Sequence, residues 1–66
     1  MTMEVGDIVY YKDWDENLIV LGESQSKKGV YRCLTYEFDV IYIDEKELNK
    51  VGTSYALFKV AYNLKN

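Results

Sequence analysis

The stretch GVYRCLTYEFDVIYI, residues 29–43, decides the fold that this chain is expected to adopt. Residues 30–36 and 38–43 are rich in β-branched and aromatic side chains, which favour β-strands. Only a tight connection near Glu37 and Asp39 separates the two segments. We therefore predict that they pair as an antiparallel hairpin.

Three further strands are predicted on either side of this hairpin. Residues 5–11 and 18–23 are short segments bounded by turn-type residues, and residues 48–51 form a short last strand. Strands spaced by about ten residues are typical of an all-β sandwich or barrel, because βαβ units need crossover helices between their strands. We thus predict an all-β fold, a five-stranded antiparallel barrel or curled sheet.

The segment DEKELNKV, residues 44–51, has an acidic first half that permits a helical turn. One turn of helix would put Leu48 and Val51 on the same face, because they stand three residues apart. Alternatively the helical turn ends before Leu48 and the last strand begins there.

The order of elements resembles the SH3-like small barrels of the KOW/Tudor type. Two features carry the resemblance: Val5-Gly6-Asp7 at the opening of the first strand, and the acidic turn of residues 44–47 before the short last strand. The resemblance covers residues 4–51 and implies a small SH3-like barrel with a short helical turn. Such barrels host unrelated functions, so the fold alone says little about activity.

The tail after the barrel departs from this resemblance. Residues 52–66 are expected to be a C-terminal extension of a single domain that spans residues 1–66. Within it, residues 55–64 are apolar or aromatic except for Lys59 and Asn63. We expect this segment to pack on its own barrel or to form the interface of a homodimer, because soluble monomers seldom expose such a patch. Its Tyr, Phe and Val content favours a strand over a helix only slightly.

Composition bounds the function. The chain has 66 residues, one cysteine, no histidine and a net charge of −3. A single thiol forms no internal disulfide and no structural zinc site, and we expect no cofactor. The N-terminus has no signal-peptide pattern and no apolar run reaches the length of a membrane span, so a cytoplasmic setting without membrane contact is expected.

No arrangement of residues in the sequence indicates an enzyme. Without histidine the usual general base near neutral pH is missing. Asp13 and Asp15 could form an acid pair, but beside Lys12 and Glu16 they read as a solvated run of charges. We expect Cys33 to be a buried core residue, because strand alternation points it away from Arg32, its basic neighbour.

A binding surface is the leading functional hypothesis. The stretch KDWDEN, residues 12–17, places the single tryptophan, Trp14, between Asp13 and Asp15 in an expected loop. Aromatic faces bordered by carboxylates suit a protein partner with a basic or cationic surface. The candidate contact residues are Tyr11, Asp13, Trp14, Asp15 and Tyr36. An open alternative is that the aromatic residues only enlarge a thin core.

A second hypothesis is a barrel that binds single-stranded nucleic acid. Lys27, Lys28 and Arg32 form the one basic cluster, and Tyr31 and Tyr36 nearby could stack on bases. Three positive charges are few for binding a polyanion on a chain of net charge −3. Compact, tyrosine-rich chains without disulfides are also similar to small phage or mobile-element proteins that bind a host protein.

Overall fold

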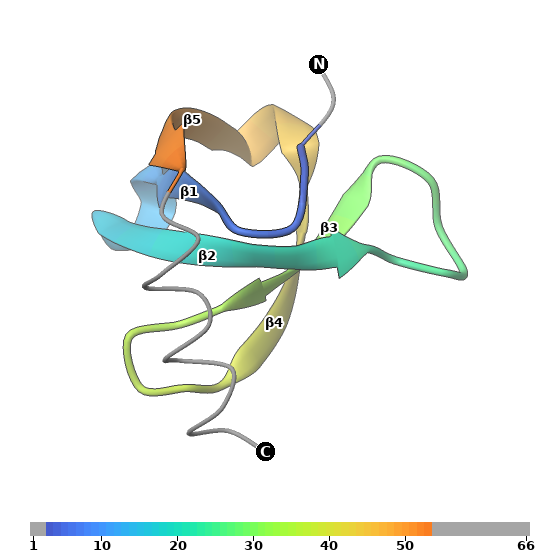
Figure 1. The fold of residues 1–66 in the computed structure, drawn as a ribbon, viewed down its shortest axis with the longest axis horizontal. Coiled ribbons are helices and arrows are strands. Elements are labelled where there is room, and N and C mark those ends of the chain that lie inside the picture. Colours follow the sequence, from blue (N-terminus) through green and yellow to red (C-terminus); the bar gives the residue numbers. More distant parts are fainter. Residues whose placement is uncertain (1–2, 54–66) are drawn as a thin grey trace.

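The computed structural model describes residues 3–53, which form a single antiparallel sheet (Figure 1). Five strands follow one another in the order β4-β3-β2-β1-β5. Two single 3₁₀ turns, η1 and η2, are the helical segments of this part of the chain. The predicted all-β fold of five antiparallel strands is confirmed. The strands are β1 (Asp7–Tyr11), β2 (Glu16–Glu23), β3 (Val30–Leu34), β4 (Val40–Asp44) and β5 (Leu48–Thr53), and the turns are η1 (Lys12–Trp14) and η2 (Glu45–Glu47).

Of the two forms that were predicted, a barrel or a curled sheet, the described residues form a curled sheet that is not closed, with β4 and β5 as its two edges. Closure depends on hydrogen bonds between the edge strands, and no local pattern in the sequence encodes them. The sheet is nevertheless strongly curled (Figure 1). Register shifts between Ile8 and Val9, and between Val20 and Gly22, mark irregularities of the kind that bend a sheet.

The predicted acidic turn is present between β4 and β5. Asp44 caps it, because the backbone N–H of Lys46 donates to Asp44 Oδ1 at 2.9 Å. The helix stops there, and Leu48 and Val51 both belong to β5. Leu48 is buried and Val51 is 58% exposed, so the option that placed them on one face is wrong. Strand positions three apart lie on opposite faces of a sheet.

The concave side of the curled sheet holds a small apolar core. Cys33 is fully buried within it, as predicted, and burial raises the pKa of its thiol to about 11. The buried hydroxyl of Tyr31 accepts a hydrogen bond from the backbone N–H of Met3 at 3.3 Å. Burial of each large apolar side chain contributes roughly 1.5–3 kcal/mol to stability. The core consists of Met3, Val9, Leu18, Val20, Tyr31, Cys33, Ile43 and Leu48.

The Val-Gly-Asp motif ties the first strand to its neighbours. Asp7 is only 2% exposed, and its Oδ2 accepts a hydrogen bond from the N–H of Glu4 at 2.9 Å. Its Oδ1 lies 3.5 Å from Nζ of Lys50 on β5. Gly6, at φ 93°, donates its N–H to the carbonyl of Val20 on β2. Asp7 therefore has a structural role at the start of β1.

The expected packing of residues 55–64, as a strand or as a homodimer interface, lies outside the described residues. Within residues 3–53, neither of the two short 3₁₀ turns has the length or the apolar character of a membrane-spanning helix.

Candidate interaction surfaces

The connection between β1 and β2 is a tight turn that holds Trp14 at the surface. Residues 12–14 form η1, and Asp15 then adopts a left-handed conformation with φ 50°. The N–H of Asp15 donates to the carbonyl of Lys12 at 3.1 Å. This geometry reverses the chain so that Tyr11 pairs with Glu16. Trp14 is therefore fixed to a short hairpin, and 52% of it is exposed.

One side of the Trp14 ring is supported by Tyr11. The two ring centroids are 5.4 Å apart, and the ring planes are tilted by 55°, a favourable geometry for aromatic contacts. Tyr11 in turn packs against the core. The tryptophan is thus anchored through Tyr11 to the interior, while about half of its surface stays in contact with solvent.

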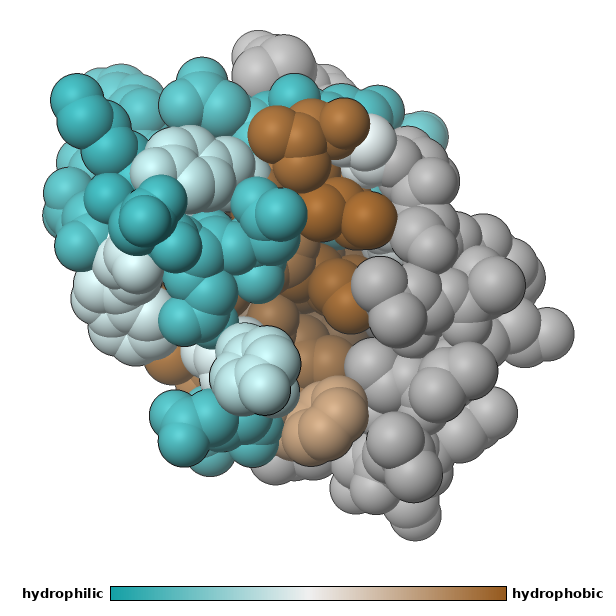
Figure 2. Space-filling view, turned by 90° about the vertical axis from the view of Figure 1, so that its left-hand side faces the viewer, coloured by the Kyte–Doolittle hydropathy of each residue, from teal (hydrophilic) through white to brown (hydrophobic). Residues whose placement is uncertain are grey.

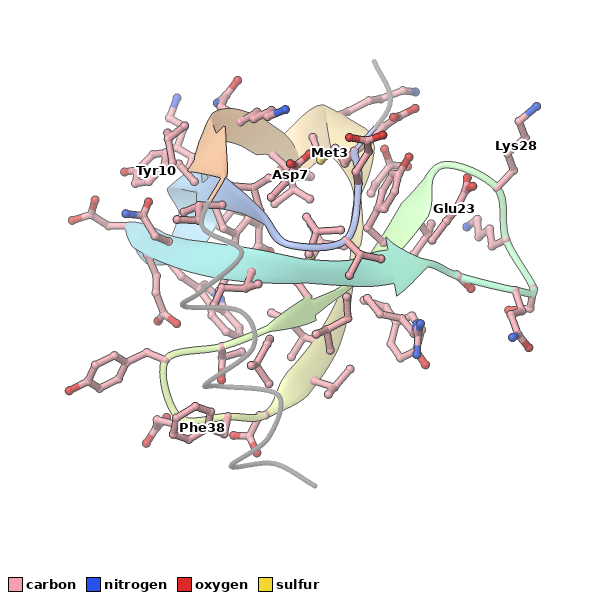
Figure 3. The ribbon with its side chains drawn as sticks, in the orientation of Figure 1. Met3, Asp7, Tyr10, Glu23, Lys28 and Phe38 are labelled. Carbon is pink, nitrogen blue, oxygen red and sulfur yellow. The ribbon has the colours of Figure 1, made fainter. Side chains whose placement is uncertain are left out.

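Carboxylates lie near the two tyrosines that lead into this turn. Tyr10 donates its hydroxyl to Asp15 Oδ1 at 2.6 Å, and this hydrogen bond raises the pKa of Tyr10 (Figure 3). Burial, followed by the negative charges of Asp13 and Glu47, raises the pKa of Tyr11. The local field around Tyr11 and Trp14 is therefore negative, which favours a positively charged group at this surface.

Tyr36 lies in the turn between β3 and β4, at the same end of the sheet as Trp14. The N–H of Tyr36 donates to Glu16 Oε2 at 3.0 Å, so this turn is tied to the first residue of β2. Tyr36 itself is 83% exposed. Figure 2 faces this side of the molecule and shows pale groups of intermediate hydropathy among teal hydrophilic ones. We call this surface the acidic-aromatic end; it comprises Tyr10, Tyr11, Asp13, Trp14, Asp15, Glu16 and Tyr36.

The basic cluster lies at the opposite end of the sheet. Lys27 and Lys28 belong to the loop between β2 and β3, and Lys28 extends away from the strands (Figure 3). Tyr31 is buried, and Tyr36 belongs to the acidic-aromatic end. The two tyrosines expected to stack on bases beside Lys27, Lys28 and Arg32 are therefore not assembled with them.

A groove missed by the sequence analysis lies beside this loop. It has a volume of about 660 Å³ and combines the loop with the outward face of β3 and β4. Tyr42, a tyrosine of the predicted hairpin that had not been named as a neighbour of the basic cluster, lies directly across from Arg32 in the register of β3 and β4. This pairing follows only once the hairpin register is known. We call this site the loop groove; it is lined by Ser24, Gln25, Ser26, Lys27, Val30, Arg32 and Tyr42.

Among residues 3–53, no three His, Cys, Asp or Glu side chains lie together in an arrangement that could hold a metal ion. A comparison with protein-family models finds no match, and no curated protein or solved structure shows a significant similarity to the chain.

Proposed function

We propose that the chain is a small, non-enzymatic protein-binding module whose acidic-aromatic end binds a basic segment of a partner protein. The observation that carries the proposal is the exposure of Trp14, 52%, on a ring that is held in place by Tyr11. Tryptophan, tyrosine and arginine are the residues that most often dominate protein interfaces. A fixed, half-exposed tryptophan is suited to such a contact.

The charge of this end selects the chemistry of the partner. Asp13 and Asp15 flank Trp14 in the turn, and the negative charge of Asp13 also acts on Tyr11. An arginine or lysine of a partner can place its cation over the Trp14 face, an attraction of roughly 0.5–2 kcal/mol. The neighbouring carboxylates add attraction at longer range, so association is expected to weaken as salt is added.

The surface is preorganised, which lowers the entropic cost of binding. The Tyr10–Asp15 hydrogen bond, the left-handed Asp15 and the tie between Glu16 and Tyr36 all restrict the two turns before any partner arrives. Loops that are already ordered lose less conformational freedom on association.

The strand order supports a more specific structural proposal. The order β4-β3-β2-β1-β5, with a single 3₁₀ turn between β4 and β5, is the arrangement expected of an SH3-like sheet. We propose that the fold is an open member of this type. The similarity in size and composition to small phage or mobile-element proteins adds a partner class, a host protein whose activity the chain modulates in the cytoplasm.

The test uses Trp14 as its own reporter, because it is the single tryptophan of the chain. Titration with a short arginine-containing peptide should change the Trp14 fluorescence saturably, and an acidic peptide of the same length should not. The Trp14→Ala variant should bind the peptide roughly ten-fold or more weakly, the loss expected for a central aromatic contact. Calorimetry measures this loss. Capture from lysate with wild type and Trp14→Ala would then identify the natural partner.

Tyr42→Ala is the matched control, because Tyr42 is also an exposed aromatic residue, at 61%, but lies in the loop groove. It should leave peptide binding unchanged. Equal losses for the two alanine variants would contradict the proposal, and so would tighter binding of the acidic peptide.

A further inference from the structure

Arg32 carries a buried polar atom that has no partner. Its Nε lies out of contact with solvent, yet no hydrogen-bond acceptor among the described residues meets it. No carboxylate in residues 3–53 lies within ion-pair distance of its guanidinium either. Buried polar groups are nearly always satisfied, because an unpaired one costs roughly 1–3 kcal/mol. Arg32 also lines a groove, where a ligand would meet the guanidinium through its terminal nitrogens rather than through the buried Nε.

The guanidinium of Arg32 packs against the backbone of Gly22 in β2. A Cβ atom on Gly22 would lie 2.9 Å from Nη2 of Arg32, so the side chain rests on the bare backbone of β2. Gly22 has φ 149°, and the register of β2 and β3 shifts at this point. The glycine therefore creates the space that Arg32 occupies.

The surroundings of Arg32 are cationic and rich in hydroxyl groups. Lys27, Ser24 and Ser26 line the same groove, and no carboxylate lines it. The hydroxyls of Ser24 and Ser26 are hydrogen-bonded to each other at 3.2 Å, so the pair has one hydroxyl proton left to donate to a ligand. The nearby carboxylate of Glu23 already accepts a hydrogen bond from the N–H of Gly29 at 2.7 Å. This combination of groups matches a phosphate, which accepts several hydrogen bonds at once.

Tyr42 gives the groove a flat aromatic surface beside Arg32. Tyr42 pairs with Arg32 across β3 and β4, and it is 61% exposed. Bases stack on such rings with little preference for sequence. A ligand that carries both a phosphate and a base can therefore contact the guanidinium and the ring together.

We propose that the loop groove binds a mononucleotide, with its phosphate on Arg32, Lys27 and the two serine hydroxyls and its base against Tyr42. The groove volume of about 660 Å³ is within the range of small-molecule sites, roughly 300–1,000 Å³. The net charge of −3 favours one nucleotide over a strand, because a polymer brings a phosphate at every step and repels the rest of the chain. This site is independent of the acidic-aromatic end.

The direct test is an NMR titration of the labelled protein with adenosine monophosphate, inorganic phosphate and a short single-stranded oligonucleotide. Adenosine monophosphate should shift the Arg32 Nε–H signal and the signals of Tyr42 saturably, while the indole N–H of Trp14 stays in place. Inorganic phosphate should shift the Arg32 signal but not the signals of Tyr42, and it should bind several-fold more weakly, because it gains no stacking. A shift at Trp14 without one at Arg32 would overturn the proposal.

Variants separate a built site from general attraction to a basic loop. Arg32→Gln should weaken binding of adenosine monophosphate by roughly ten-fold or more, the loss expected for charge-assisted hydrogen bonds. Tyr42→Ala should weaken it by about five-fold or more, as expected for a lost stacking contact, and Tyr42→Phe should not. A thermal melt of each variant confirms that the protein is folded when binding is measured.

The two loop lysines form the matched control pair. Lys27→Gln should weaken binding, whereas Lys28→Gln, which removes the same charge from a residue that extends away from the groove, should have little effect (Figure 3). Equal losses in the two variants would overturn the proposal in favour of net charge alone. An oligonucleotide that binds much more tightly than the mononucleotide, with a steep dependence on salt, would overturn it in favour of a nucleic-acid strand.

Discussion

The two ends of the sheet differ in how their charged groups are hydrogen-bonded. At the acidic-aromatic end, Asp15 and Glu16 accept hydrogen bonds from the chain itself, and the ring of Trp14 is left exposed. In the loop groove the aromatic ring of Tyr42 lies beside Arg32, whose Nε has no acceptor in the described part of the chain. One end has carboxylates whose hydrogen bonds are made within the chain, and the other has one buried donor without an acceptor among the described residues.

The comparison teaches that net charge describes this chain poorly. A value of −3 argues against anion binding when it is spread evenly over the molecule. The antiparallel topology instead collects carboxylates at the β1–β2 turn and cations at the β2–β3 loop, at opposite ends of β2. Each surface can thus have a field of its own, although the domain is small.

The largest effect is expected for Leu18→Ala, because loss of stability should weaken binding at both ends of the sheet equally. Leu18 is fully buried in β2, the strand that connects them. Its truncation should lower the free energy of unfolding by about 2–5 kcal/mol, because it leaves a cavity in a small core. Urea unfolding should show this loss. Peptide and nucleotide binding should fall in proportion to the unfolded fraction, and a loss confined to one end would contradict a shared core.

An intermediate effect is expected for Thr35→Val, which sharpens the comparison by disturbing one end alone. The buried Oγ1 of Thr35 accepts the N–H groups of Glu37 and Asp39, at 3.2 and 3.0 Å, and so shapes the turn that carries Tyr36. Loss of this acceptor should cost about 1–3 kcal/mol in unfolding experiments and weaken peptide binding. Thr35→Ser keeps the hydroxyl and is the control. Nucleotide binding should be the same in both variants once stability is taken into account.

The smallest effect is expected from the titration of Tyr10. Its pKa is raised above 10.0 by the hydrogen bond to Asp15, so the folded chain holds this proton more tightly than the unfolded chain does. The stabilisation is fully present below pH 10 and is lost as the pH rises through the folded pKa. An NMR titration that follows the ring signals of Tyr10, one of seven tyrosines, should show a lower pKa for this residue in Asp15→Asn. An unchanged Tyr10 pKa in that variant would contradict the assigned cause.

Local sequence patterns were enough to predict the strands, the acidic turn and the burial of Cys33. Each of these depends on neighbours within a few residues, such as the alternation around Cys33 and the cap that Asp44 provides. The openness of the sheet was not predictable in this way, because it depends on whether β4 and β5 meet.

The candidate sites also differ in whether local sequence or long-range strand pairing brings their residues together. The acidic-aromatic turn lies within one short segment, so its residues could be named from the sequence. The pairing of Trp14 with Tyr11 and the bond from Tyr36 to Glu16 needed the structure. The groove was missed because Gly22, Arg32 and Tyr42 become neighbours only through the registers of three strands.

The most direct test of the proposed division of labour is the indole N–H signal of Trp14 during an NMR titration with an arginine-containing peptide. We expect this signal and the amide of Tyr36 to shift together and saturably, and the Arg32 Nε–H signal to stay unchanged. Added salt should weaken the effect. A peptide that binds while Trp14 stays unperturbed, or that shifts Arg32 instead, would contradict the assignment of protein binding to the acidic-aromatic end.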